Sequence, residues 1–235
     1  MKIEEINNKI LNLINSDFAL KSILDIVPKY DVYLVGGYLR NFLLKGEISD
    51  DKDLVCIKKA KELALEIAEK LDGTFIELDK ENEIYRVALP DKKNYFDVSN
   101  ALLDDILKDA FRRDFTINSI FFNLNKKELF DPTEGLFDLQ KKILKTHDLK
   151  NFDDDPLRFL RLYRFLSLTG FKIDKNIENY VKSNFYKIQN VALERINYEI
   201  IKIFEGDYVV EALLKMLEDG VLELVFPFVK EIKRI

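Results

Sequence analysis

The stretch LVGGYLRNFLLKGEISDDKDLVC, residues 34–56, places a glycine pair directly after a short apolar run and gathers aspartates directly before another. Residues 31–35 predict a short strand, Gly36 and Gly37 predict a tight turn, and residues 38–44 predict a helix. Such a turn lets a ligand approach the backbone closely, and the start of the helix favours an anion such as phosphate. The alternative is a turn with a purely structural role.

The pattern of apolar residues divides the chain into a mixed first half and a helical second half. The first half predicts a further helix, a strand, a second helix and three strands, at residues 3–26, 53–57, 58–71, 74–78, 84–89 and 95–99. From about Asp153 onward it predicts only helices, at residues 156–168, 177–184, 193–204 and 209–217. We therefore expect an α/β or α+β layer domain, a boundary near residues 140–150, and a second, helical domain.

The composition excludes several kinds of chemistry. Cys56 and His147 are the only cysteine and the only histidine among 235 residues, which excludes a disulfide framework, a Cys/His zinc site and a Ser-His-Asp relay. The net charge of −5 disfavours a generally basic nucleic-acid coat, although a local basic face could still hold a polyanion. The sequence has no apolar run of membrane-helix length and its start does not resemble a signal peptide, so the expected location is the cytoplasm.

Three aspartates are the strongest candidates for chemistry. On an extended strand Asp51 and Asp53 point to the same face, where two carboxylates repel each other unless a cation such as magnesium neutralises them. Asp97 lies within the apolar pattern YFDVSN, where a charge is costly unless it is paired or metal-bound. Three carboxylates from two strands would suit a two-metal phosphoryl-transfer site. The alternatives are a solvated turn for the first two and an edge-strand aspartate for Asp97.

Several motifs, in this order, resemble the class II tRNA nucleotidyltransferase and bacterial poly(A) polymerase family of the polymerase-β-like superfamily. They are LVGGYLRNFLLKGEISDDKDL, RRDFTINSI, FDPTEGLFDLQKKILKT, DDPLRFLRLYRF and ERINYEI, and the resemblance covers about residues 30–205. It implies an α+β fold, with a nucleotidyltransferase head of mixed sheet and flanking helices over residues 1–145. A helical neck and the start of a body domain, binding the nucleotide base and RNA, would occupy residues 146–235.

The resemblance also implies roles for individual residues of the head. Two aspartates would bind the metal ions and a third would complete the catalytic set, namely Asp51, Asp53 and Asp97. The triphosphate and the ribose would be bound by Gly36, Gly37, Arg40, Arg113, Asp114 and Asn118. The structural alternatives are that Asp114 caps a helix beginning at Phe115 and that Asn118 is a buried amide. Asp50 matches no ligand, and the connecting motif with Asp131, Pro132, Gly135 and Asp138 would act as a hinge.

In the neck, Asp155 and Arg158 of DDPLR match the motif that reads the base edge of the incoming nucleotide. Positions i and i+3 share a helix face, so the pair could present an acceptor carboxylate beside a guanidinium fork; the alternative is an intrahelical salt bridge. Arg161 and Arg164 would hold phosphates or RNA, or form a solvated basic stripe. In the last motif, Glu194 and Arg195 would brace the neck.

The implied reaction is the template-independent transfer of CMP or AMP from CTP or ATP to the 3′-hydroxyl of tRNA, with release of pyrophosphate and two Mg²⁺ ions. The short segment between Asp97 and Arg112 is similar to the CC-adding subgroup. Two positions depart from the family pattern: Asn41 stands where Asp is frequent, and Asp154 stands in place of Glu. A poly(A) polymerase, a catalytically silent RNA-binding module and a nucleotidyltransferase for small molecules or protein are alternatives. Relatives continue into a body and tail, so a compact member and a truncated one both stay open.

Overall fold

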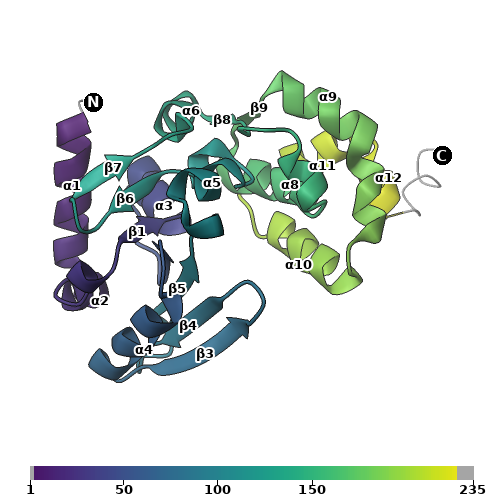
Figure 1. The fold of residues 1–235 in the computed structure, drawn as a ribbon. Helices are drawn as coiled ribbons and strands as arrows, with labels where there is room; N and C mark the ends of the chain where they lie inside the picture. The colour runs from purple at the N-terminus through teal and green to yellow at the C-terminus, as the bar shows by residue number, and fades with distance from the viewer. Residues whose placement is uncertain (1–2, 227–235) are drawn as a thin grey trace. The chain divides into compact units, whose positions relative to one another are not determined.

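The computed structural model describes residues 3–226, which form two compact units (Figure 1). The first unit extends to Phe111 and includes Ile117–Leu136, whereas the second comprises Arg112–Thr116 and the chain from Phe137 onward. Within residues 3–226, no helix is both long and apolar enough to cross a membrane. The end of the predicted second domain, residues 227–235, lies outside the described residues.

The first unit is built on a mixed seven-stranded sheet in the order β3-β4-β5-β2-β1-β6-β7. Strands β2 and β5 are parallel, and the other neighbouring pairs are antiparallel. The bounds are β1 Val32–Val35, β2 Asp51–Cys56, β3 Thr74–Asp79, β4 Ile84–Ala88, β5 Tyr95–Asn100, β6 Phe121–Asn123 and β7 Glu128–Phe130. The predicted α+β class with a mixed sheet is therefore confirmed.

Helices cover the sheet on both faces. The larger core contains buried residues of α1–α4 and of the sheet, whereas a smaller cluster on the opposite face involves α5. Side chains alternate along β2, so Leu54 and Cys56 join the larger core and Asp51 and Asp53 project from the other face. The helical bounds are α1 Ile3–Ser16, α2 Phe18–Ile23, η1 Val27–Lys29, α3 Gly37–Lys45, α4 Ala60–Lys70, η2 Leu102–Asp104 and α5 Ile106–Phe111.

The prediction of one helix over residues 3–26 is wrong. Asp17 interrupts it, because its backbone is extended and its carboxylate accepts the N–H of Leu20 as the N-cap of α2. The apolar period continues across this break because α1 and α2 both bury residues in the same core.

The second unit is mainly helical. Helix α8 packs against α10 and α11, and Phe115, Phe152, Phe159 and Phe165 are buried in this unit. Its elements include η3 Thr116–Asn118 and α6 Gly135–Lys141, which both cross the unit boundary, and α7 Asn151–Asp154, α8 Arg158–Thr169, α9 Lys175–Asn184, η4 Phe185–Asn190, α10 Leu193–Phe204, α11 Val209–Glu218 and α12 Val221–Val225.

The expectation of only helices after Asp153 needs one correction. A short strand, β9 Lys172–Ile173, pairs in parallel with β8 Ile143–Leu144. Two residues carry too little alternation to be recognised as a strand in the sequence.

Candidate active site

Asp51, Asp53 and Asp97 lie together on the face of the sheet opposite the larger core. Parallel pairing of β2 with β5 sets Asp53 directly beside Asp97. One oxygen from each of the three carboxylates lies within 4.8 Å of the others, and all three residues are half-buried. The sequence therefore correctly predicted three acidic groups from two neighbouring strands.

The electrostatics of the cluster suit a cation. Burial, and then the negative charge of Asp97, raise the pKa of Asp51 above its ordinary value, against the lowering effect of Arg86. Its Oδ1 atom is buried and has no hydrogen-bond partner among the described residues. An unpaired carboxylate oxygen beside two further carboxylates is the hard donor set that Mg²⁺ prefers.

Arg86 of β4 faces the cluster and was not identified in the sequence. Arg86 lies opposite Asp97 in the β4–β5 pairing, and its Nε and Nη2 atoms donate hydrogen bonds to Oδ1 and Oδ2 of Asp97, both at 2.7 Å. Its guanidinium lies over the ring of Tyr95, 4.0 Å from the centroid. The argument that identified Asp97, a charge within an apolar strand pattern, applies equally to IYRVA and would have found Arg86.

The glycine turn contacts the same carboxylates. Gly36 has a φ of +79°, and a Cβ atom at this position would lie 2.2 Å from Oδ2 of Asp53. Gly37 begins α3 with an ordinary backbone, and a Cβ there would contact Arg40 at 3.5 Å. Gly36 is thus required by both its backbone conformation and the approach of Asp53, whereas the sequence suggested only the approach of a ligand.

Lys52 lies between the two aspartates of β2 but points into the opposite face of the sheet. It is 1% exposed, and its Nζ atom donates to Oδ1 of Asn94 at 2.8 Å and pairs with Oδ2 of Asp17 at 3.3 Å. The hydroxyl of Tyr38, directly after the glycine turn, donates to the same Asp17 oxygen at 2.8 Å. This buried network joins the start of α3 to the strand that carries the carboxylates, and the sequence analysis did not anticipate it.

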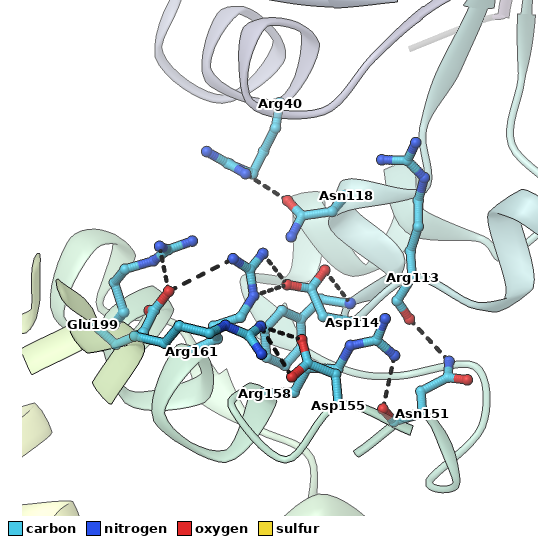
Figure 2. Close-up of polar contacts among 12 residues, drawn as sticks. Arg40, Arg113, Asp114, Asn118, Asn151, Asp155, Arg158, Arg161 and Glu199 are labelled. Atoms are coloured by element: carbon cyan, nitrogen blue, oxygen red, sulfur yellow. Dashed lines mark hydrogen bonds and ion pairs between the residues drawn. The ribbon is translucent and has the colours of Figure 1, made fainter. Parts of the chain in front are cut away.

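Arg40 contacts two amides of the first unit. It donates to Oδ1 of Asn118 and, through Nε and Nη2, to Oδ1 of Asn41 at 3.2 and 3.0 Å (Figure 2 shows the contact with Asn118). Asn118 is 6% exposed, so the interpretation of Asn118 as a buried amide is correct. Its side-chain oxygen accepts the hydrogen bond from Arg40. Asn41, one of the two expected departures from the family pattern, accepts hydrogen bonds from Arg40. Asp50 is exposed.

In the second unit, Asp114 is the centre of a charged network (Figure 2). It is 5% exposed, its Oδ1 accepts the N–H of Phe115 at 2.8 Å, and its Oδ2 accepts from Nε of Arg161 at 2.8 Å. A short helix begins at Thr116, so the expected capping contact of Asp114 is present near a helix start. The same carboxylate also binds Arg161. The carbonyl of Arg113 accepts from the side-chain amide of Asn151.

Arg161 and Arg164 do not form a solvated stripe. Arg164 donates to Oε1 of Glu199 at 2.9 Å, and Nη1 of Arg161 lies 3.8 Å from the same oxygen. Glu199 is 1% exposed, and burial raises its pKa even though Arg164 and Arg161 act in the opposite direction. Two cations that share one buried carboxylate indicate a structural network. Glu199 was missed, although the sequence ERINYE places it one helical turn after Arg195.

Asp155 and Arg158 do not share a helix face, which corrects the sequence prediction. Asp155 follows α7 with extended backbone angles, and α8 begins only at Arg158 because Pro156 occupies the turn between the two helices. Asp155 forms an ion pair with Arg195 at 3.1 Å, whereas Nη1 of Arg158 donates to the carbonyl of Asn151 at 2.8 Å. The alternative, an intrahelical salt bridge between Asp155 and Arg158, is therefore wrong as well.

The remaining motif residues have local structural contacts. Asp131 accepts the N–H groups of Gly135 and Leu136 at the start of α6, and Asp138 accepts from the hydroxyl of Thr116 at 2.7 Å. Pro132 is half-buried beside them. The boundary between the units falls between Leu136 and Phe137, inside the connecting motif. The hinge role of this motif stays a prediction. Glu194 is exposed.

Two family models match the chain. The "Poly A polymerase head domain" matches residues 32–145, and the "Probable RNA and SrmB- binding site of polymerase A" matches residues 170–233. Among curated proteins, the "CC-adding tRNA nucleotidyltransferase" of Synechocystis sp. is 34% identical over 191 residues, which cover 80% of this chain and 45% of the relative. The "CCA-adding enzyme" of Listeria innocua is 30% identical over 201 residues, covering 80% and 50%.

Solved structures of CCA-adding enzymes also match the fold of this chain. The "Thermotoga maritima CCA-adding enzyme complexed with tRNA_CCA" superimposes with a TM-score of 0.81 at 29% identity, over 97% of this chain and 56% of that chain. A complex of a CCA-adding enzyme with CTP gives a TM-score of 0.80 at 29% identity, over the same shares of the two chains. The chain thus spans about half the length of the relatives that it matches.

Proposed function

Because the chain belongs to the tRNA nucleotidyltransferase and poly(A) polymerase family, we propose that it transfers CMP, AMP or both from CTP and ATP to the 3′-hydroxyl of tRNA, releasing pyrophosphate. The observation that carries the proposal is the cluster of Asp51, Asp53 and Asp97 within 4.8 Å beside the glycine turn.

In this proposal Asp51 and Asp53 hold Mg²⁺ ions and Asp97 completes the set. When bound, the two ions would supply Lewis-acid activation of the attacking hydroxyl and neutralise charge on the leaving pyrophosphate. Gly36 lets the carboxylate of Asp53 lie against the backbone just before α3, and the triphosphate would bind at the first N–H groups of that helix. Arg40 is held by Asn118 and Asn41 and offers positive charge to the phosphates from the first turn of α3.

Residues of the second unit would select and orient the nucleotide. Arg158 uses Nη1 for the carbonyl of Asn151, and a guanidinium carries five N–H donors, so further donors can read a base edge. Asp155 would supply the acceptor, with Arg195 as its counterion. A base whose donors and acceptors did not match would leave buried polar groups unpaired, which is how such a site rejects the wrong nucleotide.

Arg113 and Asp114 would contact the ribose, and Arg161 would hold Asp114 in place for this. Arg161 and Arg164 could bind phosphate or RNA only by giving up part of their contact with Asp114 and Glu199. We therefore propose that Arg161 and Arg164 support the nucleotide site indirectly, by holding Asp114 and Glu199 in place.

Labelled CTP and ATP, separately and together with Mg²⁺, test the proposal on two tRNA transcripts, one lacking the CCA end and one ending in CC. Addition of C to the first transcript and of A to neither means CC-adding, which we favour because the segment after Asp97 is short. Addition of A as well means CCA-adding, and A on the CC-ended transcript alone means A-adding. Nucleotide binding without any incorporation would leave a silent RNA-binding module.

The description of the matched head domain favours a second candidate, a poly(A) polymerase. Product length separates the two, because a tRNA-completing enzyme stops after a fixed number of residues whereas a poly(A) polymerase extends without limit. Use of CTP also argues against the poly(A) polymerase. A cytoplasmic location is part of the proposal in either case.

A further inference from the structure

The third carboxylate of the cluster already has a counterion from the protein. Arg86 donates one hydrogen bond to each oxygen of Asp97, both at 2.7 Å. The pairing is fixed by the sheet, since the two residues are directly opposite each other on β4 and β5. Stacking over the ring of Tyr95 at 4.0 Å restricts the guanidinium further. Both oxygens of Asp97 are therefore bound to a cationic side chain of the protein.

The neighbouring Asp51 is in the opposite situation. Its Oδ1 atom is buried and has no hydrogen-bond partner among the described residues, so it can accept a cation without losing a contact. A cation that also used Asp97 would have to share at least one oxygen with Arg86 or displace it, against the positive charge of the guanidinium. The cluster thus contains one carboxylate that is open to a metal and one that is already paired, although both belong to the same acidic set.

We propose that Arg86 competes with the divalent cation for Asp97 and thereby sets the metal affinity of the site. In the metal-free state Arg86 neutralises Asp97 and keeps three carboxylates together without a bound ion. When a cation binds, Asp97 exchanges part of its contact with Arg86 for the cation. Arg86 acts through Asp97 and does not itself bind the cation. This inference rests on the proposed function only in that the cluster binds a divalent cation.

Terbium luminescence provides a direct readout of the site. The chain has no tryptophan and ten tyrosines, and Tyr95 is the partner of Asp51 in the parallel pairing of β2 with β5, so Tb³⁺ in the cluster would be sensitised by an adjacent tyrosine. Titration of the full chain with Tb³⁺, and displacement of Tb³⁺ by Mn²⁺ or Mg²⁺, gives affinities without any turnover. An Asp51→Ala/Asp53→Ala double variant identifies the part of the signal that belongs to the cluster.

The decisive variant is Arg86→Met. Removing the competitor should tighten cation binding about tenfold, because Asp97 no longer has to weaken a charge-assisted hydrogen bond when the cation binds. In an Asp97→Asn background the same change should tighten binding by less than about threefold, because the competition is gone. Lys29→Met, which removes an exposed cation that pairs with Glu66 away from the cluster, is the control for net charge and should leave the affinity unchanged.

Unchanged or weaker Tb³⁺ binding in Arg86→Met would overturn the proposal, because it would mean that Arg86 holds Asp97 where the cation needs it. An equal gain in the Asp97→Asn background would also overturn it. If Arg86→Met does not fold by circular dichroism, Arg86→Lys replaces it, since Lys keeps the charge without the bidentate fork, and is expected to tighten binding by a smaller factor. Cluster-dependent Tb³⁺ binding by a chain that incorporates no nucleotide would contradict the proposed function and not this inference.

Discussion

Substituting Gly36 by alanine would displace a carboxylate of the proposed active site by a known amount. The added Cβ atom would lie 2.2 Å from Oδ2 of Asp53, and ordinary contact begins near 3.4 Å, so this oxygen must move by about 1 Å. The backbone contributes a second cost. Gly36 has φ +79° and ψ −145°, a region in which only glycine is common, and strain of this kind costs about 1–3 kcal/mol.

Gly46 supplies the matched control at the other end of the same helix. It has φ +73° and ψ 12°, and nothing lies within 4 Å of the Cβ that an alanine would add. Gly46→Ala therefore tests backbone strain alone, at about 1–2 kcal/mol. The far end of the Asp53 side chain can move aside, so we expect the loss of stability in Gly36→Ala to exceed the control by no more than about 2 kcal/mol.

Catalysis should respond far more strongly than stability. A displacement of about 1 Å in a catalytic group can lower the rate about 100-fold, so we expect a loss of this order in kcat for nucleotide incorporation by Gly36→Ala. Gly46→Ala should retain most of its activity. Urea denaturation gives the free energy of unfolding, and single-turnover incorporation of labelled CTP gives the rate. Equal rates in the two variants, at equal stability, would refute the assignment of Gly36 to the carboxylate site.

Three further predictions concern buried charges. Asp51→Asn should lose more than about 100-fold in incorporation, yet raise the free energy of unfolding at neutral pH, because the raised pKa of Asp51 reflects an unfavourable charge. This gain should grow as the pH rises from the ordinary value of 3.8 through the folded-state pKa and vanish at lower pH, which denaturation at several pH values would check. Lys52→Met should cost about 3–5 kcal/mol in urea denaturation by stranding Asp17, and a cost below about 1 kcal/mol would contradict the buried network. Glu199→Gln should lower the free energy of unfolding by about 1–3 kcal/mol. It should also raise the KM for nucleotide, because Arg161 loses the carboxylate beside it, and an unchanged KM would show that Glu199 does not act on the nucleotide site through Arg161.

Local patterns made the head of the protein predictable. The short apolar run, the glycine pair and the alternation of Asp51 and Asp53 each depend on neighbours a few residues away, and the strands and helices around them were predicted with bounds close to those observed. The argument that an isolated charge in an apolar strand needs a partner identified Asp97 as a site residue, but it gave neither the parallel pairing that sets Asp97 beside Asp53 nor Arg86 as its counterion.

Partners distant in the sequence could not be predicted in the same way. The bond between Arg161 and Asp114 spans 47 positions, and the choice of Glu199 as the acceptor for Arg164 spans 35. Nothing in the local sequence distinguishes these arginines from a solvated stripe. The helix-face argument for Asp155 and Arg158 failed for a local reason, because Pro156 restricts the preceding residue to an extended conformation and α8 starts after it.

Mg²⁺-dependent incorporation of labelled CMP into a tRNA transcript lacking its CCA end, by this chain alone, tests the central claim most directly. The wild-type chain should add nucleotide, and the Asp51→Ala/Asp53→Ala double variant should add it at least about 1,000-fold more slowly, since both proposed metal ligands are lost. The double variant should remain folded, because neither side chain is part of the larger core. Incorporation that is equal in the two proteins, or absent from a folded wild-type chain, would contradict the account.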